Sequence, residues 1–308
     1  MKLTKKQLNF FDTFGFLAFP GLFLDDIENI TSAFEDVWSR NGGGHFGQEH
    51  DGAQRSALIQ FIDQDEYLSA LIDDPRIDEV CASVLGDDYN YTGSDGNFYV
   101  GDTMWHSDGY RKSKYRSFKM AFYLDPVDAT SGCLRVIPGS HKHGDLFANS
   151  LEEVHTARDS SNNPSDEIWG VDGNEVPAVP LEITPGDLVM FNHQIKHSSW
   201  GGGERRRMFT LNFEERYANP DLPELRERIG AEARFWIDRI YGDVIIKTAT
   251  ASRMVHLEQR MANDYHMPEL VRKHQEANAE PSRGRLPSTR FGQKVEFIGT
   301  NFNGCRTH

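Results

Sequence analysis

The central part of the chain, from about residue 90 to residue 217, contains short apolar runs with the length and composition of β-strands. Four of them stand out, and Gly, Pro or Asn residues bound each one: 118–124, 132–138, 188–191 and 208–213. Aromatic and β-branched residues in runs of this length favour strands over helices. We therefore expect a mainly β fold with helices before and after the β core.

Helical patterns flank this β core on both sides. Thr4, with Gln7 three residues later, is typical of a capping box, and the helix is expected to end at Gly15, before a strand at 16–19. A second helix is expected to start at residues 24–26, with an apolar face that runs to Trp38. Residues 1–89 would then cover the β core at 90–217, and residues 218–308 would form a helical extension with an irregular tail.

No linker divides the chain, so we expect one domain over residues 1–308. Residues 145–178 interrupt the β core with a polar stretch rich in Ser, Asn and Asp. Such a stretch predicts an insertion or a mobile loop, and binding residues often lie on segments of this kind.

Charge and cysteine content exclude several classes of protein. A net charge of −14 disfavours a protein that tracks nucleic-acid phosphates, because such proteins gain affinity from Lys and Arg. The three cysteines include no Cys-x-x-Cys pair, which argues against a disulfide framework and a cysteine zinc site. No apolar run approaches the roughly 18 residues needed to span a bilayer. We expect a cytoplasmic monomer or homodimer that binds neither nucleic acid nor membrane.

Two histidines and an aspartate form a candidate metal site. His106 and Asp108 are two residues apart at the end of an expected strand, so both side chains can point to the same side. His197 follows the strand at 188–191 after a short turn. Two imidazoles and one carboxylate make a facial triad, which leaves adjacent positions open on iron(II). His-x-Asp with a distant His is a weak pattern alone, and its flanking residues carry the stronger signal.

Five groups of residues, in a fixed order, surround these positions between about residue 10 and residue 217. They are Phe14–Leu17 with Pro20–Phe23, Trp105–Gly109, Leu124–Asp125 leading into Gly132–Lys142, Pro185–Phe191 with His197–Ser199, and Arg207–Leu211. In these groups and their order the chain resembles the phytanoyl-CoA dioxygenase family, which includes ectoine hydroxylase and many bacterial oxygenases of small metabolites.

The resemblance implies a double-stranded β-helix core, also called a jelly roll or cupin-like fold, and an oxygenase that depends on iron(II) and 2-oxoglutarate. His106, Asp108 and His197 would bind the iron, and 2-oxoglutarate and dioxygen would be co-substrates. The reaction would hydroxylate an unactivated C–H bond of a small metabolite and release succinate and carbon dioxide.

The resemblance also implies an arginine, shortly after the distal histidine, that binds the far carboxylate of 2-oxoglutarate. A guanidinium suits this task because it offers two parallel hydrogen bonds to a carboxylate. Arg205, Arg206 and Arg207 are the candidates. Arg207 begins the last strand, as the family's arginine does, and is the expected contact, whereas Arg206 would point the opposite way into solvent. Ser199 matches a family hydroxyl that contacts the same acid, and Ser198 stands where the family usually has Gly.

Other polar residues near the motifs have simpler interpretations. His141 is expected to be structural or to lie near the pocket rim, and His193 to support a ligand or lie exposed. The basic cluster at 111–116 is either a solvated loop or a substrate contact. In the second case, Arg111 and Arg116 would hold an anionic small-molecule substrate near the metal.

The carboxylate of Asp108 favours hydroxylation over halogenation, because related halogenases have a small residue at that position. Desaturation or cyclisation on the same iron site stays open, since the placement of the substrate decides among these outcomes. Outside this class, the alternative is a non-oxidative metal-dependent jelly-roll enzyme, such as an isomerase or a hydrolase. A non-catalytic binding protein is disfavoured by the intact triad, and a serine hydrolase by the lack of a Gly-x-Ser-x-Gly motif.

Overall fold

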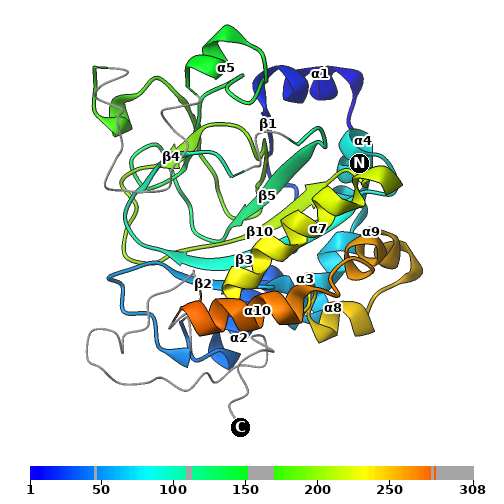
Figure 1. The fold of residues 1–308 in the computed structure, drawn as a ribbon. Helices are drawn as coiled ribbons and strands as arrows, with labels where there is room; N and C mark the ends of the chain where they lie inside the picture. Colours follow the sequence, from blue (N-terminus) through cyan, green and yellow to red (C-terminus); the bar gives the residue numbers. More distant parts are fainter. Residues whose placement is uncertain (45–46, 109–112, 152–169, 279–280, 282–308) are drawn as a thin grey trace.

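Two antiparallel sheets form the centre of the computed structural model, which describes residues 1–44, 47–108, 113–151, 170–278 and 281 (Figure 1). The larger sheet has the strand order β1-β8-β5-β10-β3-β2, and the smaller has the order β4-β9-β6-β7. The strands are β1 (Phe16–Phe19), β2 (Ser56–Ile59), β3 (Asn90–Tyr99), β4 (Thr103–His106), β5 (Ser117–Tyr123), β6 (Leu134–Val136), β7 (Val179–Leu181), β8 (Leu188–Asn192), β9 (His197–Ser199) and β10 (Arg206–Glu214). The predicted jelly-roll core with flanking helices is confirmed.

Helices cover the larger sheet and continue beyond it at the C-terminal end. The α-helices are α1 (Lys5–Phe14), α2 (Ile27–Arg40), α3 (Glu66–Ser69), α4 (Pro75–Leu85), α5 (Leu146–Ser150), α7 (Leu222–Gly230), α8 (Asp243–Lys247), α9 (Ala251–Met261) and α10 (Met267–Ala277). Short 3-10 helices are η2 (Ile62–Gln64), η3 (Ala70–Asp73), η4 (Gly173–Glu175), η5 (Asn219–Asp221) and η6 (Ala231–Phe235). Within the described ranges, no helix is long and apolar enough to cross a membrane.

The first helix begins and ends where the sequence predicts. Thr4 and Gln7 form the capping box, and Gly15 ends α1 with a φ of +86°. The second helix begins at Ile27 rather than at residues 24–26. Asp26 occupies its N-cap position but accepts no capping hydrogen bond, because its carboxylate pairs with Arg76 at 2.7 Å.

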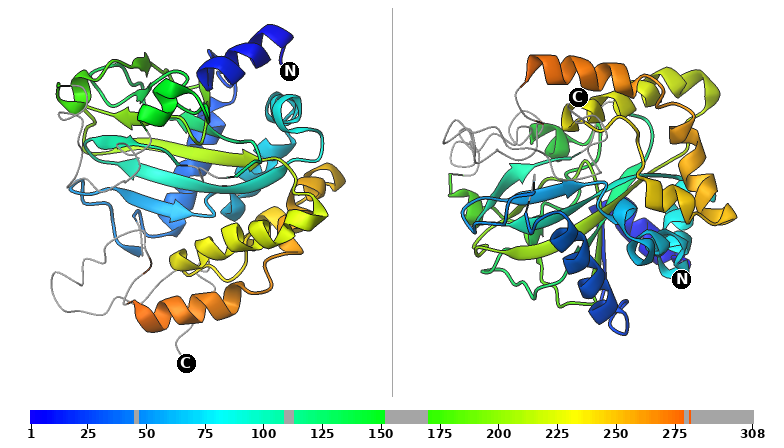
Figure 2. Two further views of the ribbon diagram at one scale, coloured as in Figure 1. Left: turned by 45° about the horizontal axis from the view of Figure 1, so that its top comes forward. Right: turned by 90° about the horizontal axis from the view of Figure 1, so that it is seen from below.

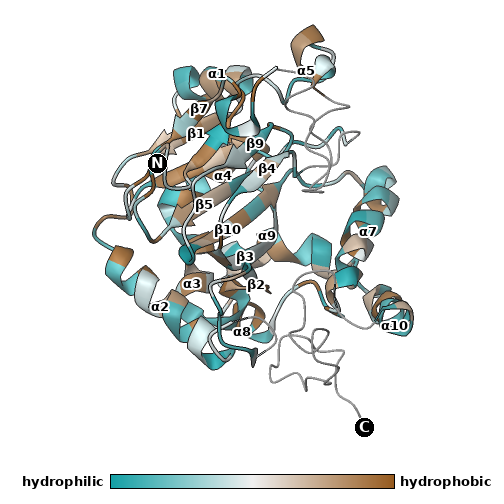
Figure 3. Ribbon diagram, turned by 90° about the vertical axis from the view of Figure 1, so that its left-hand side faces the viewer, coloured by the Kyte–Doolittle hydropathy of each residue, from teal (hydrophilic) through white to brown (hydrophobic). Residues whose placement is uncertain are grey.

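Strand alternation divides the interior into two main cores. On β10, Phe209, Leu211 and Phe213 belong to the large core that the helices cover, whereas Met208 belongs to the core between the two sheets. In the large core, the Trp38 and Phe98 rings stack with their centroids 4.2 Å apart. Figure 3 shows apolar residues along β5 and β10 and many hydrophilic residues along α7. The polar residues of the same strands are left to face the smaller sheet, where the candidate site lies.

The C-terminal helices predicted beyond residue 217 are present and lie on one side of the sheets (Figure 2). Their buried residues, including Leu225, Trp236 and Leu257, belong to the same large core as α2 and β10. Of the polar stretch at 145–178, the structure describes α5 and η4, and residues 152–169 lie outside the described residues.

Candidate active site

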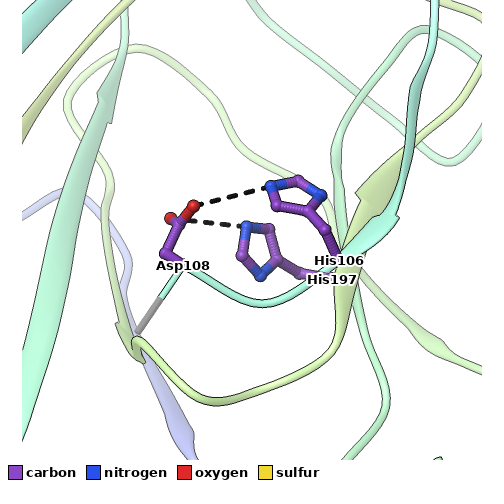
Figure 4. A group of neighbouring side chains, drawn as sticks. All are labelled: His106, Asp108 and His197. Carbon is purple, nitrogen blue, oxygen red and sulfur yellow. Dashed lines mark ion pairs between the residues drawn. The ribbon is translucent and has the colours of Figure 1, made fainter. Parts of the chain in front are cut away.

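The end of β4 and the start of β9 bring the three predicted metal ligands together. Antiparallel pairing places His106 opposite His197, and Asp108 follows β4 directly. The Nε2 atoms of His106 and His197 lie 3.6 Å from Oδ1 and Oδ2 of Asp108, respectively (Figure 4). One ligand atom from each residue lies within 4.8 Å of the other two. Three donors at this spacing can share a single metal ion.

Backbone carbonyls fix the orientation of both imidazoles. His106 Nδ1 donates to the carbonyl oxygen of Met104 at 2.7 Å, and His197 Nδ1 donates to that of Ile195 at 3.0 Å. Because a carbonyl oxygen can only accept, Nδ1 carries the hydrogen and Nε2 presents its lone pair to the triad. Hydrogen bonds of this kind orient histidine ligands in metal sites.

Asp108 is held from two sides. Its backbone N–H donates to the carbonyl oxygen of His193 at 2.8 Å, and the neighbouring Ser107 hydroxyl donates to that of Gln194 at 2.8 Å. On the other side, the Lys119 ammonium lies 2.6 Å from Asp108 Oδ2, with 12% of the lysine side chain exposed. Sequence reasoning missed Lys119. Its signal was a charged residue inside the apolar run 118–124.

Two cavities meet at the triad. The inner cavity lies between the sheets and is lined by both histidines, by Ser198 and Ser199, and by further side chains of both sheets. The outer cavity has a volume of about 450 Å³ and lies between the larger sheet and the C-terminal segment. Asp95, Asp108 and Lys119 line both cavities. A molecule in the outer cavity would therefore be adjacent to the triad.

Arg206, not Arg207, lies in the inner cavity, so the predicted orientation of this pair is wrong. Arg206 is 6% exposed, and its Nη2 donates to Ser199 Oγ at 3.1 Å. Its Nε and Nη1 have no hydrogen-bond partner among the described residues. Arg207 faces the other side of β10, where it pairs with Asp125 at 2.5 Å and with Glu35 at 2.9 Å.

The alternation of β10 explains this arrangement. Met208 and Thr210 line the inner cavity with Arg206, and Asn212 and Glu214 line the outer one. The alternate residues, from Arg207 onward, face the helix-covered side. The prediction that the two arginines point in opposite directions was right, but it assigned each of them to the wrong side.

The serines after His197 have different surroundings. Ser199 lies in the inner cavity beside Arg206, as its predicted role requires. Ser198, which replaces a glycine of the family pattern, accepts a hydrogen bond from Trp200 Nε1 at 2.9 Å and also lines this cavity. The role of Ser199 in binding a co-substrate stays a prediction.

Of the two arginines expected to contact the substrate, the structure describes only Arg116. Arg111 lies outside the described residues. Arg116 is exposed and forms an ion pair with Asp12 of α1, and it lines neither cavity. The structure therefore argues against a substrate contact by Arg116, because its guanidinium is held by a carboxylate on another element.

His141 and His193, the two other histidines near the motifs, do not join the triad. His141 packs against the backbone of Gly15, where an added Cβ would lie 2.6 Å from its Nδ1. Burial lowers the pKa of His141 to about 4. His193 is hydrogen-bonded to Asn212 at 3.0 Å, lines the outer cavity, and holds Asp108 through its carbonyl oxygen.

Solved structures of several proteins share this fold. The carbocyclase SnoK from nogalamycin biosynthesis, described as non-heme and alpha-ketoglutarate dependent, is 21% identical, with a TM-score of 0.54 over 69% of this chain and 84% of that chain. EctD from S. alaskensis, with 2-oxoglutarate and 5-hydroxyectoine, is 20% identical, with a TM-score of 0.51 over 69% and 76%. HygX from Streptomyces hygroscopicus, with nickel and 2-oxoglutarate, is 17% identical, with a TM-score of 0.52 over 70% and 89%.

At these identities the structural likeness establishes the fold. A search of curated protein sequences gives no match. The family model for phytanoyl-CoA dioxygenase matches residues 11–208, a range that contains the triad and, except for Thr210, the residues that line the inner cavity. The chain therefore belongs to the phytanoyl-CoA dioxygenase family.

Proposed function

We propose that this protein is an iron(II)- and 2-oxoglutarate-dependent oxygenase that hydroxylates an unactivated C–H bond of a small metabolite. One observation carries the proposal: a buried guanidinium with two unpartnered nitrogens lies in the same cavity as a His-Asp-His triad. A buried donor without an acceptor costs free energy. A carboxylate ligand between Arg206 and the triad would remove that cost.

The donor set fits iron(II). His106, Asp108 and His197 would hold the metal through two imidazole nitrogens and one carboxylate, which is the facial triad of non-heme oxygenases. Lys119 would hold the Asp108 side chain in position, because its ammonium lies 2.6 Å from the carboxylate oxygen Oδ2.

Arg206 and Ser199 fit the far carboxylate of 2-oxoglutarate. The guanidinium can donate two parallel hydrogen bonds to that group, and the Ser199 hydroxyl already fixes its position from the side. Iron with 2-oxoglutarate supplies the oxidising chemistry, with succinate and carbon dioxide as co-products. The residues of this chain bind and orient the reactants and keep water away from them.

The outer cavity is the place for the substrate, since it reaches Asp108 and Lys119 from the side opposite to Arg206. The Asp108 carboxylate favours hydroxylation over halogenation, because it occupies the position that a halide would need. Desaturation and cyclisation use the same site, and the structural relatives include a carbocyclase. Hydroxylation is the simplest of these outcomes, since it needs one reactive C–H bond held near the metal.

Succinate release tests the proposal. Purified protein with iron(II), 2-oxoglutarate and dioxygen is expected to release succinate, slowly without substrate and faster when metabolite pools contain it. Under anaerobic conditions, iron(II) and 2-oxoglutarate together should give a weak visible charge-transfer band. Asp108→Ala should abolish both signals. A zinc-dependent isomerase or hydrolase would give neither in the wild-type protein, and that result would overturn the proposal.

A further inference from the structure

The C-terminal segment forms one wall of the outer cavity. The other wall comes from β3, β5 and β10. Its residues on β3 and β5 lie within the range that the family model matches, and Asn212 and Glu214 of β10 follow that range. Residues of α7, η6 and α9 close the cavity from the opposite side: Arg228, Glu232, Arg234, Phe235 and Arg260. The family model ends at residue 208, so this wall belongs to the part of the chain beyond it.

Two arginines of this wall share one carboxylate. Glu214, at the end of β10, lies 2.8 Å from Arg228 Nη2 and 3.6 Å from Arg260 Nη1, and its side chain is 1% exposed. These contacts are ion pairs without good hydrogen-bond geometry for the carboxylate oxygens. Burial raises the pKa of Glu214, although both guanidiniums oppose the shift. Glu214 is thus the shared ion-pair partner of Arg228 and Arg260.

Arg260 has an unused donor at this cavity. The residue is 3% exposed, and its Nε has no hydrogen-bond partner among the described residues. A buried guanidinium nitrogen without an acceptor is unfavourable, and most buried donors in proteins are satisfied. An acceptor on a bound molecule would satisfy it.

Arg234 adds a third cation, at the exposed rim. Its guanidinium lies over the Phe235 ring at 4.5 Å, and the ion pairs of the described residues do not include it. Glu232 contributes the only carboxylate of the C-terminal wall of this cavity as described. On this wall three arginines therefore stand against one carboxylate, which leaves an excess of positive charge, whereas Asp95, Asp108, Glu214 and Lys119 lie on the opposite wall. The whole chain carries −14, so this local excess runs against the overall charge.

Apolar side chains complete the cavity. Phe235, Ile237 and Ile240 from the C-terminal segment and Ile59 from β2 line it beside the arginines. A volume of about 450 Å³ lies within the range typical of small-molecule sites. The lining thus combines a cationic group of residues with apolar surface.

We infer that the C-terminal segment selects a small amphipathic anion as substrate, a carboxylate or phosphate monoester on an apolar body. Arg260 and Arg234 contact the anionic group, and the isoleucines and Phe235 contact the apolar body. This inference rests on the proposed function, because the outer cavity is a substrate site only if the triad holds the reacting metal.

Equilibrium binding to the intact protein tests the inference without a known substrate. Protein saturated with iron(II) and 2-oxoglutarate under anaerobic conditions is titrated calorimetrically with 4-phenylbutyrate, phenyl phosphate and the uncharged 4-phenylbutanol. We expect at least one anion to bind about tenfold or more tightly than the alcohol. Comparison of the two anions distinguishes a carboxylate from a phosphate substrate.

Variants assign the preference to the two arginines. Arg234→Gln and Arg260→Met should each weaken binding of the anion by about threefold to a hundredfold and leave binding of the alcohol unchanged. Arg260→Lys keeps the charge and the fold and should retain part of the preference. Arg239→Gln is the matched control, because Arg239 is exposed, pairs with Asp243 at 2.5 Å and does not line the cavity.

The same samples distinguish a failure of this inference from a failure of the proposed function. A wild-type protein that shows the anaerobic charge-transfer band but binds no anion better than the alcohol would overturn this inference alone. The same holds if Arg234→Gln and Arg260→Met both bind the anions as the wild type does. Loss of the band in the wild-type protein would instead overturn the proposed function, and this inference with it.

Discussion

Arg206 places a permanent positive charge in a cavity where it is 6% exposed and has Ser199 as its only hydrogen-bond partner among the described residues. We expect Arg206→Met to raise the Kd for 2-oxoglutarate by about thirtyfold or more, because a buried charge pair is worth about 2 kcal/mol or more. Anaerobic titration with iron(II), followed by the charge-transfer band, measures this Kd.

Arg207→Met is the matched control, since it removes the same side chain from the next position on β10. It should leave the Kd for 2-oxoglutarate within about twofold. It should also lower the free energy of unfolding by about 1 kcal/mol, because Arg207 is partly exposed and pairs with Asp125 and Glu35. The reverse pattern, with Arg207→Met losing 2-oxoglutarate, would restore the assignment expected from sequence.

His141 predicts a pH dependence of stability. Its folded pKa of about 4 lies below the unfolded value near 6.5, so the unfolded chain binds more protons between these values. The contribution is fully present above pH 6.5 and is lost as the pH falls toward 4. Between pH 7 and pH 5 we expect a loss of about 2 kcal/mol.

Urea unfolding at pH 7 and pH 5 measures this loss. In His141→Asn the fall in unfolding free energy between the two pH values should be smaller by about 2 kcal/mol than in the wild type. His143→Asn, at an exposed position two residues away, should behave as the wild type does. Equal pH dependence in wild type and His141→Asn would show that burial of this imidazole is not what costs stability in acid.

At this scale, sequence predicted the triad but not the arginine beside it. The positions of His106, Asp108 and His197 in the sequence match positions that the fold of this family brings together. The arginine depended instead on which side of β10 faces the site. Phe209, Leu211 and Phe213 lie on the apolar side of β10, and Arg207, two residues before Phe209, lies on the same side. That pattern places Arg206 on the polar side. The pattern is weakest at the first residue of a strand, because no earlier strand residue fixes which side that residue faces.

Among the strands, β3 shows how closely the larger sheet and its helices pack. Gly96 of β3 pairs with Phe209 of β10 and Leu58 of β2, and a Cβ at this position would lie 2.1 Å from the ring of Phe61. Phe61 is fully buried among the rings of Phe34 and others, so it has no room to move away.

Gly96→Ala should therefore destabilise the protein by about 1–3 kcal/mol through overpacking. The midpoint of urea unfolding measures the change. Gly203→Ala is the control, because nothing lies within 4 Å of a Cβ at Gly203, and its effect should stay within about 0.5 kcal/mol. Equal midpoints for the two variants would mean that Phe61 can shift at little cost.

The sequence of β3 also explains why this strand was not predicted. β3 reads Asn-Tyr-Thr-Gly-Ser-Asp-Gly-Asn-Phe-Tyr, in which Asn, Gly, Ser and Asp disfavour strands. These residues are tolerated because one side of β3 lines the polar cavities and Gly96 gives room to Phe61. The apolar runs that become β5, β8 and β10 were predictable, since they pack on apolar layers. A strand whose residues line a functional site lacks such an apolar run.

Across the whole molecule, the C-terminal segment and the family-matched part share one core and one site. The buried residues Ile229, Trp236 and Tyr241 belong to the same core as Phe98 of β3. Hydrogen bonds also connect the two parts, from Asn90 Nδ2 to Gln259 Oε1 and from the Gly242 N–H to Asp63. The segment that lines the outer cavity is therefore also a segment that the β core needs for stability.

This sharing predicts that the segment cannot be removed without loss of the fold. A chain ending at residue 217 would expose the apolar surfaces that the C-terminal helices cover, and it would leave Asp63 and Asn90 without their partners. The free energy gained from apolar burial of this extent exceeds the free energy of unfolding of a typical domain, roughly 5–15 kcal/mol. We expect the shortened chain to aggregate or to lack a cooperative thermal transition, and the full chain to unfold in one transition by circular dichroism and calorimetry. A soluble shortened chain that unfolds cooperatively near the full-length midpoint would show instead that residues 1–217 fold alone. Substrate selection could then be exchanged between relatives by exchanging the segment.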